Sequence, residues 1–131
     1  MDMEITFPGG KKVDATYKGF TMRTDQPKQA GGDGSAAEPF SLFLASLGTC
    51  AGYYVLTFCQ QRDLPSDEIT LLLQFKRDER THMMTQIDIH IQVPQEFPDQ
   101  YTKALVRAAE VCAVKKHLEI PPSITIDVRK Q

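Results

Sequence analysis

The sequence predicts a mixed α+β domain in which antiparallel-rich sheets surround a long, buried central helix. Residues 40–59 form an uncharged run whose apolar residues lie on every side of a helical projection, as in a helix that the rest of its domain encloses. Stretches that alternate apolar and polar residues precede and follow this run, as in strands with one buried face. The predicted element order is β-β-β-α-β-β-α-β.

Length, charge and composition restrict the functional classes. A chain of 131 residues has the size of one domain, so residues 1–131 are expected to form a single domain. The net charge of −2 and the lack of a basic stripe give no support for nucleic-acid binding. The N-terminus has neither the basic nor the apolar region of a secretory signal, so a cytoplasmic protein is expected. Three cysteines without a C-x-x-C motif and three scattered histidines predict no zinc site, no disulfide framework and no cofactor.

An N-terminal meander of three strands is expected before a loop. Around turns at Pro8–Gly10 and Lys18–Gly19, apolar residues alternate with polar ones at Met3, Ile5, Phe7, Val13, Ala15, Tyr17, Phe20 and Met22. Residues 25–37 are rich in Gly, Pro and Asp and are predicted to be a flexible lead into the central helix. Ser35 and Glu38 have the spacing of a capping box at the start of that helix.

The central run permits a second interpretation, a membrane span. Its length would cross a bilayer, and Gly48 and Gly52 have the spacing of a helix-packing motif found in lipid. However, the run holds hydroxyl residues and two tyrosines, and no basic cluster flanks it. A buried helix in a protein without membrane contact is therefore favoured, with the two glycines allowing another backbone to approach closely.

Two strands, a helix and a last strand are predicted in the second half. Residues 69–76 are strongly apolar, and residues 86–93 alternate strictly, which places His90 on the solvent face. Alternating apolar residues at 124–128 predict a final strand. The spacing predicts a helix over 99–118, and one face of it carries Tyr101, Leu105, Ala108 and Cys112.

Helical geometry limits how the three cysteines can pair. Cys59 lies nine residues after Cys50, so the two side chains point to opposite faces about 13 Å apart along the axis, too far for a disulfide. Cys50 and Cys112 can both face the seam between the two predicted helices, so they are the feasible pair. Either this pair carries redox chemistry, or all three cysteines are small buried hydrophobic residues.

A redox-active thiol must be ionised at neutral pH, which requires a pKa below the free-cysteine value of about 8.5. Cys50 lies about three turns into its helix, where the helix dipole no longer acts. The sequence therefore predicts that a cation from elsewhere in the chain activates Cys50. Arg23 is preferred over Lys11 and Lys12, because a guanidinium stays charged when partly desolvated.

The run GGDGSAAEPFSLFLASLGTC, in which a Gly-rich loop and a proline precede a helical cysteine, resembles the OsmC/Ohr superfamily of osmotically inducible and organic hydroperoxide resistance proteins. A second cysteine 62 residues later, in RAAEVCAVKKHLEIPPSITIDV, fits the same pattern. The resemblance implies an OsmC-like, intertwined homodimer with thiol sites near the subunit interface. It also implies that Cys50 attacks a peroxide and becomes a sulfenic acid, that Cys112 condenses with it to a disulfide, and that an external dithiol reductant reopens the bond.

The charged partners depart from the pattern of the dedicated peroxidases in this superfamily. Those enzymes carry a glutamate directly after the helix-starting proline, where this chain has Phe40; Glu38 is the nearest acid. Their activating arginine lies earlier in the N-terminal hairpin, and Arg23 in RTDQP is more like the general OsmC-like branch. Arg23 and Glu38 are carried over as candidate catalytic partners of the two cysteines.

We expect a thiol-dependent peroxidase that acts on organic hydroperoxides first and on hydrogen peroxide second. Leu47, Tyr53 and Tyr54 are predicted to bind a hydrocarbon tail, because burying apolar area is worth about 25 cal/mol per Å². The alternative is a non-enzymatic stress-response protein of the same fold that binds a small ligand and uses its cysteines structurally, and the missing glutamate favours this alternative. A Cys50 pKa near or above about 8.5 would favour the binding protein, and one well below about 7 would favour the enzyme.

Overall fold

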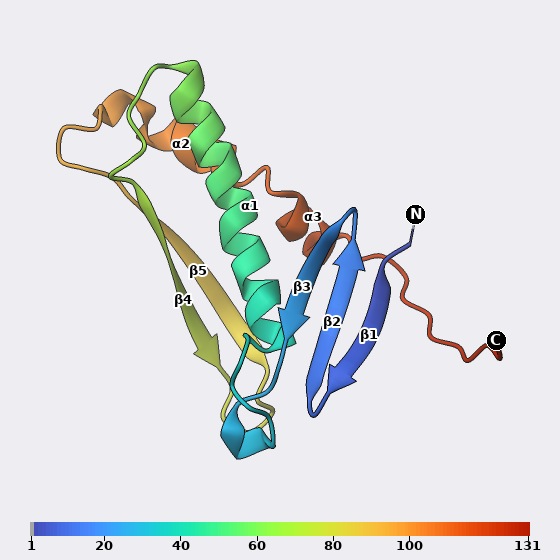
Figure 1. Cartoon of the computed structure of the whole chain (residues 1–131). Helices are drawn as coiled ribbons and strands as arrows, with labels where there is room; N and C mark the ends of the chain where they lie inside the picture. The colour runs from blue at the N-terminus through green and yellow to red at the C-terminus, as the bar shows by residue number, and fades with distance from the viewer. Residues whose placement is uncertain (1) are drawn as a thin grey trace. The chain divides into compact units, whose positions relative to one another are not determined.

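The computed structural model describes residues 2–131, which form antiparallel sheets and helices of a mixed α+β fold, as predicted (Figure 1). The chain has two compact units, Met1–Ala45 and Ser46–Gln131. The central helix α1 (Pro39–Gln61) begins in the first unit and continues in the second. The single domain over the whole chain stays a prediction.

The first unit is built on the predicted three-stranded meander. Its strands pair antiparallel in chain order: β1 (Glu4–Gly9), β2 (Lys12–Tyr17) and β3 (Phe20–Thr24). Lys18 and Gly19 form the turn between β2 and β3, and both have left-handed φ angles, 52° and 81°. This two-residue turn geometry matches the twist of the flanking strands, which explains why a glycine stands there.

The loop after β3 is folded around a buried carboxylate, so the prediction of a flexible lead is wrong. Asp25 is 0% exposed. It accepts hydrogen bonds from the Ser35 hydroxyl (2.6 Å) and from the backbone N–H groups of Ser35 (3.0 Å), Gln26 (2.7 Å) and Asp33 (3.3 Å). These donors, the Ser35 hydroxyl first, favour the charged form and hold the pKa of Asp25 well below its ordinary value. Gly32 is required in this loop because a Cβ there would collide with the Gln26 carbonyl.

The start of α1 differs from the predicted capping box, because Ser35 is already bound to Asp25. Glu38 takes the capping position: its backbone carbonyl accepts from the N–H groups of Ser41 (3.0 Å) and Leu42 (3.3 Å). Its carboxylate accepts a hydrogen bond from the Ser41 hydroxyl at 2.8 Å. Pro39 then occupies the first helical position, where its missing N–H is not needed.

The second unit packs the rest of α1 against a hairpin and a helix. The elements after α1 are β4 (Thr70–Arg77), β5 (Met84–Gln92), a 3-10 turn η2 (Asp99–Tyr101), α2 (Thr102–Ala109) and α3 (Ala113–Glu119). The core of this unit consists of Val55, Phe58 and Cys59 from α1 with Phe97 and Leu105. Among the described residues, α1 is the helix long and apolar enough to cross a membrane, and its second half contributes Val55, Phe58 and Cys59 to this core. The absence of membrane contact stays a prediction.

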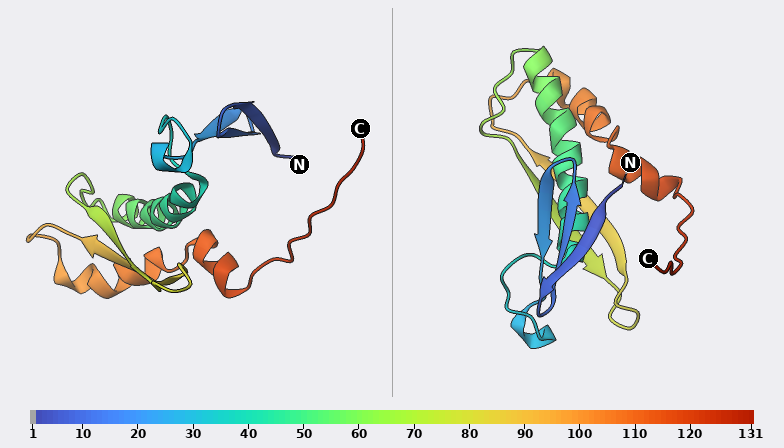
Figure 2. Two further views of the ribbon diagram at one scale, coloured as in Figure 1. Left: turned by 90° about the horizontal axis from the view of Figure 1, so that it is seen from below. Right: turned by 45° about the vertical axis from the view of Figure 1, so that its right-hand side comes forward.

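Three expectations for the second unit are wrong. The helix predicted over 99–118 is interrupted at 110–112, although its predicted inner face is buried where it carries Leu105 and Cys112, both 2% exposed. The glycines of α1 face side chains rather than a backbone, since a Cβ on Gly48 would lie 3.1 Å from the Leu73 side chain. Residues 121–131 form no strand; in Figure 2 they run as an irregular trace from the end of α3. Alternation alone does not make a strand, because its backbone groups need a neighbouring strand to pair with.

Replacing Asp25 by asparagine is expected to lower the midpoint of urea unfolding. The asparagine side chain has an NH₂ group in place of one carboxylate oxygen, and this group cannot accept hydrogen bonds from the N–H and O–H donors of the loop. Asp67→Asn, which changes an exposed carboxylate, is the matched control and should leave the midpoint unchanged. The difference in stability between wild type and Asp25→Asn should be largest above pH ~4. It should shrink as the pH falls toward the lowered pKa of the native carboxylate, because the wild type also loses this contribution there. An unchanged midpoint, or a deficit that grows on acidification, would contradict this role of Asp25.

Candidate active site

Two of the three cysteines lie together in the second unit. Cys50 is half-buried in the middle of α1, and Cys112 is 2% exposed directly before α3. The two thiols share a hydrogen bond. All three cysteines are free, and Cys59 lies fully buried in the core with Phe97 and Leu105. The structure thus brings together the pair that helical spacing selected, while the chemical roles of the two residues stay predictions.

Cys112 explains why the predicted second helix is interrupted. Its backbone is not helical (φ −43°, ψ 122°), and its Sγ accepts a hydrogen bond from the N–H of Lys115 at 3.4 Å, so it is the N-cap residue of α3. Its Sγ also lies 4.0 Å from the carbonyl oxygen of Leu47 on α1. The interruption at 110–112 therefore coincides with the contacts of Cys112 to α1 and to the first turn of α3, and no glycine or proline marks it.

The surroundings of Cys50 lower its pKa. Burial has the opposite effect and alone would raise the pKa, but three hydrogen bonds to the sulfur outweigh it. The donors are the backbone N–H of Val114, the thiol of Cys112 and the backbone N–H of Ala113. Each stabilises the thiolate, because a hydrogen bond to the charged form of a group favours that form.

Cys112 is shifted the other way. Burial raises the pKa of Cys112, and although the N–H of Lys115 opposes this change, the hydrogen bond with Cys50 and the charge on the Cys50 thiolate raise it further. Cys50 is therefore the group that ionises first, and Cys112 keeps its proton and donates a hydrogen bond to Cys50. Such a pair consists of one nucleophilic sulfur and one protonated sulfur within reach of it.

The sequence predicted that a cation activates Cys50. None of the three groups that lower its pKa is a cation, because two are peptide N–H groups and one is a neutral thiol. The helix whose first turn acts on Cys50 is α3, not the helix that carries Cys50. Arg23, exposed on β3, and Glu38, at the start of α1, both belong to the first unit. Their roles as charged partners of Cys50 stay predictions.

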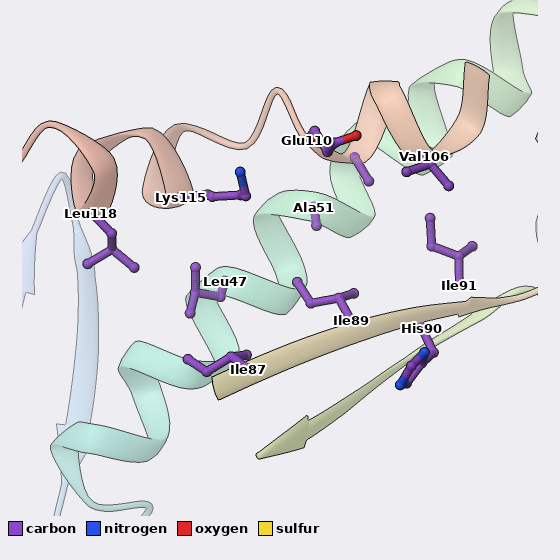
Figure 3. A pocket seen from close by; sticks show the side chains of 11 residues that line it. Leu47, Ala51, Ile87, Ile89, His90, Ile91, Val106, Glu110, Lys115 and Leu118 are labelled. Atoms are coloured by element: carbon purple, nitrogen blue, oxygen red, sulfur yellow. The ribbon is translucent and has the colours of Figure 1, made fainter. Parts of the chain in front are cut away.

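A half-open cavity of about 580 Å³ lies next to α1 in the second unit (Figure 3). Its walls are apolar apart from three polar side chains, and the lining residues are Leu47, Ala51, Ile87, Ile89, His90, Ile91, Val106, Ala109, Glu110, Lys115 and Leu118. Ile87, Ile89 and Ile91 project from one side of β5, whereas the His90 ring lies on the other side, 3.1 Å from the Gln74 amide oxygen. The exposure predicted for His90 is confirmed.

The cavity includes only part of the predicted substrate pocket. Leu47 lines it, but Tyr53 and Tyr54 do not. Tyr53 is 61% exposed, and its ring packs edge-on against that of Tyr54 at a centroid distance of 5.2 Å. Strict alternation identified the inward face of β5, but no sequence pattern indicates that a cavity remains beside it. Among residues 2–131, no group of three or more His, Cys, Asp or Glu side chains is placed to hold a metal ion.

The family of the chain follows from its sequence. The profile of the family described as OsmC-like protein matches residues 32–127, a span that includes both Cys50 and Cys112. The chain therefore belongs to the OsmC-like protein family. A comparison with curated protein sequences finds no match.

Solved structures share the fold. An osmotic stress induced and detoxification response protein from Psychrobacter arcticus 273-4 has a TM-score of 0.73 at 22% identity, over 87% of this chain and 85% of that chain. An organic hydroperoxide resistance protein from Vibrio cholerae O1, with captopril in one of its active sites, has a TM-score of 0.58 at 18% identity, over 90% and 84%. The organic hydroperoxide resistance protein OhrB of Bacillus subtilis has a TM-score of 0.51 at 23% identity, over 88% and 89%. At these identities, the likeness shows the fold.

Replacing Ala113 by proline is expected to raise the pKa of Cys50, because it removes one N–H donor to the sulfur. Proline suits this position: Ala113 is exposed and is the first residue of α3, and the ψ of Cys112, 122°, lies in the range that a residue before proline prefers. Ala113→Gly keeps the N–H and is the matched control. The pKa is measured from the pH dependence of Cys50 alkylation, followed by peptide mass spectrometry. Equal profiles for the proline and glycine variants would contradict activation by this N–H.

Proposed function

We propose that the protein is a thiol-dependent peroxidase that reduces organic hydroperoxides, with hydrogen peroxide as the poorer substrate. The observation that carries this proposal is the pairing of a half-buried thiol of lowered pKa, Cys50, with a buried thiol of raised pKa, Cys112. Membership of the OsmC-like family supports a stress-related role. Two proteins of the same fold are named organic hydroperoxide resistance proteins.

The reaction uses the two sulfurs in sequence. The Cys50 thiolate attacks the terminal peroxide oxygen, the O–O bond breaks, and the alcohol leaves with a proton, which yields a sulfenic acid on Cys50. The Cys112 sulfur then attacks the Cys50 sulfur, the S–O bond breaks, and the hydroxyl group leaves as water with the Cys112 proton. The thiol pair has lost two electrons, which reduce ROOH to ROH and H₂O. An external dithiol reductant restores both thiols by thiol–disulfide exchange.

The cavity beside α1 supports a substrate with a hydrocarbon tail. Its volume falls within the range of roughly 300–1,000 Å³ typical of small-molecule sites. The lining residue Leu47 lies one turn before Cys50 on α1, and Ala51 follows Cys50 directly. Burial of an alkyl or aryl tail against the β5 isoleucines would stabilise the complex by about 25 cal/mol per Å².

Cys50→Ser is expected to abolish the consumption of cumene hydroperoxide, because a hydroxyl is not ionised at neutral pH. Cys112→Ser should consume about one equivalent per chain and stop at the sulfenic acid, since no second sulfur is within reach. Cys59→Ser, which changes a cysteine of the core, is the control and should keep full activity. Consumption by the reduced wild type that is no faster than consumption by free cysteine would contradict the proposal.

A second candidate function is non-enzymatic binding of a small apolar ligand. The observation that favours it is the cavity itself, because neither Cys50 nor Cys112 is among its lining residues. Two measurements distinguish the two functions. If Cys50→Ser still binds an apolar probe and the wild type consumes no peroxide, the second candidate is supported.

The protein is further proposed to act as a homodimer in the cytoplasm, without nucleic acid or membrane. The support is the apolar side chains that the second unit leaves exposed, since a soluble monomer rarely exposes large apolar patches. They include Tyr53, Leu56, Leu72, Phe75, Ile124, Ile126 and Val128, of which the last three are more than 80% exposed.

Light scattering in detergent-free buffer is expected to give twice the mass of the chain, because burial of these side chains between two copies removes apolar surface from water. Ile126→Asp should shift the equilibrium toward the monomer, whereas Lys130→Asp, which replaces a charged residue of the same segment, should not. A soluble wild type with the mass of one chain would contradict the dimer, and a protein that needs detergent would contradict the absence of membrane contact.

A further inference from the structure

The charged side chains of the cavity beside α1 lie on one side of it. Glu110, at the end of α2, and Lys115, in α3, lie along one edge, and the isoleucines of β5 lie opposite them (Figure 3). The third polar lining residue is His90, whose ring lies on the other side of β5 against Gln74. The cavity therefore has an apolar floor and one charged edge, which suits a ligand with a hydrocarbon part and a polar end.

The lysine of this edge already has a carboxylate partner. Lys115 Nζ donates a hydrogen bond to Glu119 Oε1 at 2.5 Å, one helical turn later. Glu119 is the main cause of the raised pKa of Lys115, and the charge of Glu110 adds to it. Lys116, a second cation near Glu119, is not among the lining residues. A negatively charged ligand would therefore have to compete with Glu119 for the ammonium group of Lys115.

The carboxylate of this edge, Glu110, has no such partner. None of the ion pairs among residues 2–131 includes it, not even one with Arg107, three residues earlier on α2. A positively charged ligand group would neutralise Glu110 and leave the pair of Lys115 with Glu119 intact. A ligand carboxylate would lie near Glu110, where like charges repel. The two signs of charge on a ligand are thus not equivalent in this cavity.

We propose that the cavity selects apolar ligands by the charge of their polar end, favouring a positive charge over a carboxylate, and that Glu110 sets this preference. The favoured class is an aliphatic or aryl amine, whose protonated nitrogen lies at Glu110 while its hydrocarbon part lies on the isoleucines of β5. Exposed charge pairs are weak, so burial of the tail supplies most of the affinity and Glu110 supplies the discrimination.

The charged edge adjoins the thiol pair. Leu47 and Lys115 both line the cavity, and their backbone atoms lie 4.0 and 3.4 Å from the Cys112 sulfur. In so far as hydroperoxides use this cavity, which rests on the proposed function, those with a carboxylate near the peroxide group are the poorer substrates. The apolar side chains proposed for dimer contact are not among the lining residues, so that contact does not use them.

The test is competition binding to the full-length, reduced protein at neutral pH, in which ligands displace the uncharged fluorescent probe Nile red. Octylamine, octanol and octanoate share one tail length, and the amine and the acid are charged at this pH as lysine and glutamate side chains are. Octylamine is expected to bind at least about threefold more tightly than octanoate, with octanol between them. The difference should narrow at high salt, because salt screens exposed charges.

Three variants locate the effect. Glu110→Gln should remove most of the difference between octylamine and octanoate, and Glu110→Lys should reverse it. Glu79→Gln, which changes an exposed carboxylate outside the cavity lining, is the matched control and should keep the difference. Val106→Trp fills the cavity from a half-exposed position on α2 and should weaken the binding of all three ligands.

Octanoate that binds the wild type as tightly as octylamine would overturn the proposal, and so would an unchanged difference in Glu110→Gln. Equal affinities for Val106→Trp and wild type would also overturn it, because the ligands would then lie outside the cavity. These measurements contain no peroxide, so they do not depend on peroxidase activity. A protein can fail them and still consume hydroperoxide, or pass them and consume none.

Discussion

The hydrogen bonds between two sulfur atoms and the first turn of α3 are the interaction on which the rest of the site depends. They provide partners for N–H groups that would otherwise have none within the helix. They also stabilise the Cys50 thiolate and place the Cys112 thiol against it. Capping of a helix, activation of a nucleophile and positioning of a second thiol are thus consequences of one arrangement.

Activation by backbone donors differs physically from activation by a nearby cation. The charge of an exposed lysine or arginine is screened by water and salt, and its long side chain loses conformational entropy when it is held in one place. The N–H groups of Ala113 and Val114 are fixed by the helix they begin, so they are already oriented when the thiolate forms. Preorganised donors of this kind require little reorganisation during the reaction.

Much of the architecture was predictable, because alternation and the uncharged central run report directly on burial. The meander, the central helix and the β4–β5 hairpin lie where those patterns indicated. Cys50 and Cys112 were also predicted as the feasible cysteine pair, because helical geometry excludes a disulfide between Cys50 and Cys59. These features depend on residues close together in sequence or on one repeating spacing.

The features that sequence reasoning missed depend on particular contacts that composition and periodicity do not reveal. No glycine or proline marks the break at 110–112; it forms because the Cys112 side chain contacts α1 and caps α3. The composition of residues 25–37 indicates a flexible loop, but the buried Asp25 carboxylate collects four hydrogen bonds there. The alternation at 124–128 is that of a strand, but neither β4 nor β5 pairs with this segment.

The most direct test of the account is an NMR titration of the reduced wild-type protein that follows the backbone amide protons of residues 113–115. If Ala113 and Val114 donate to Cys50, their amide protons should shift together as the thiol ionises, with one common midpoint below the free-cysteine value of about 8.5. Amide protons that do not respond to the ionisation of Cys50, or a midpoint at or above the free-cysteine value, would contradict it.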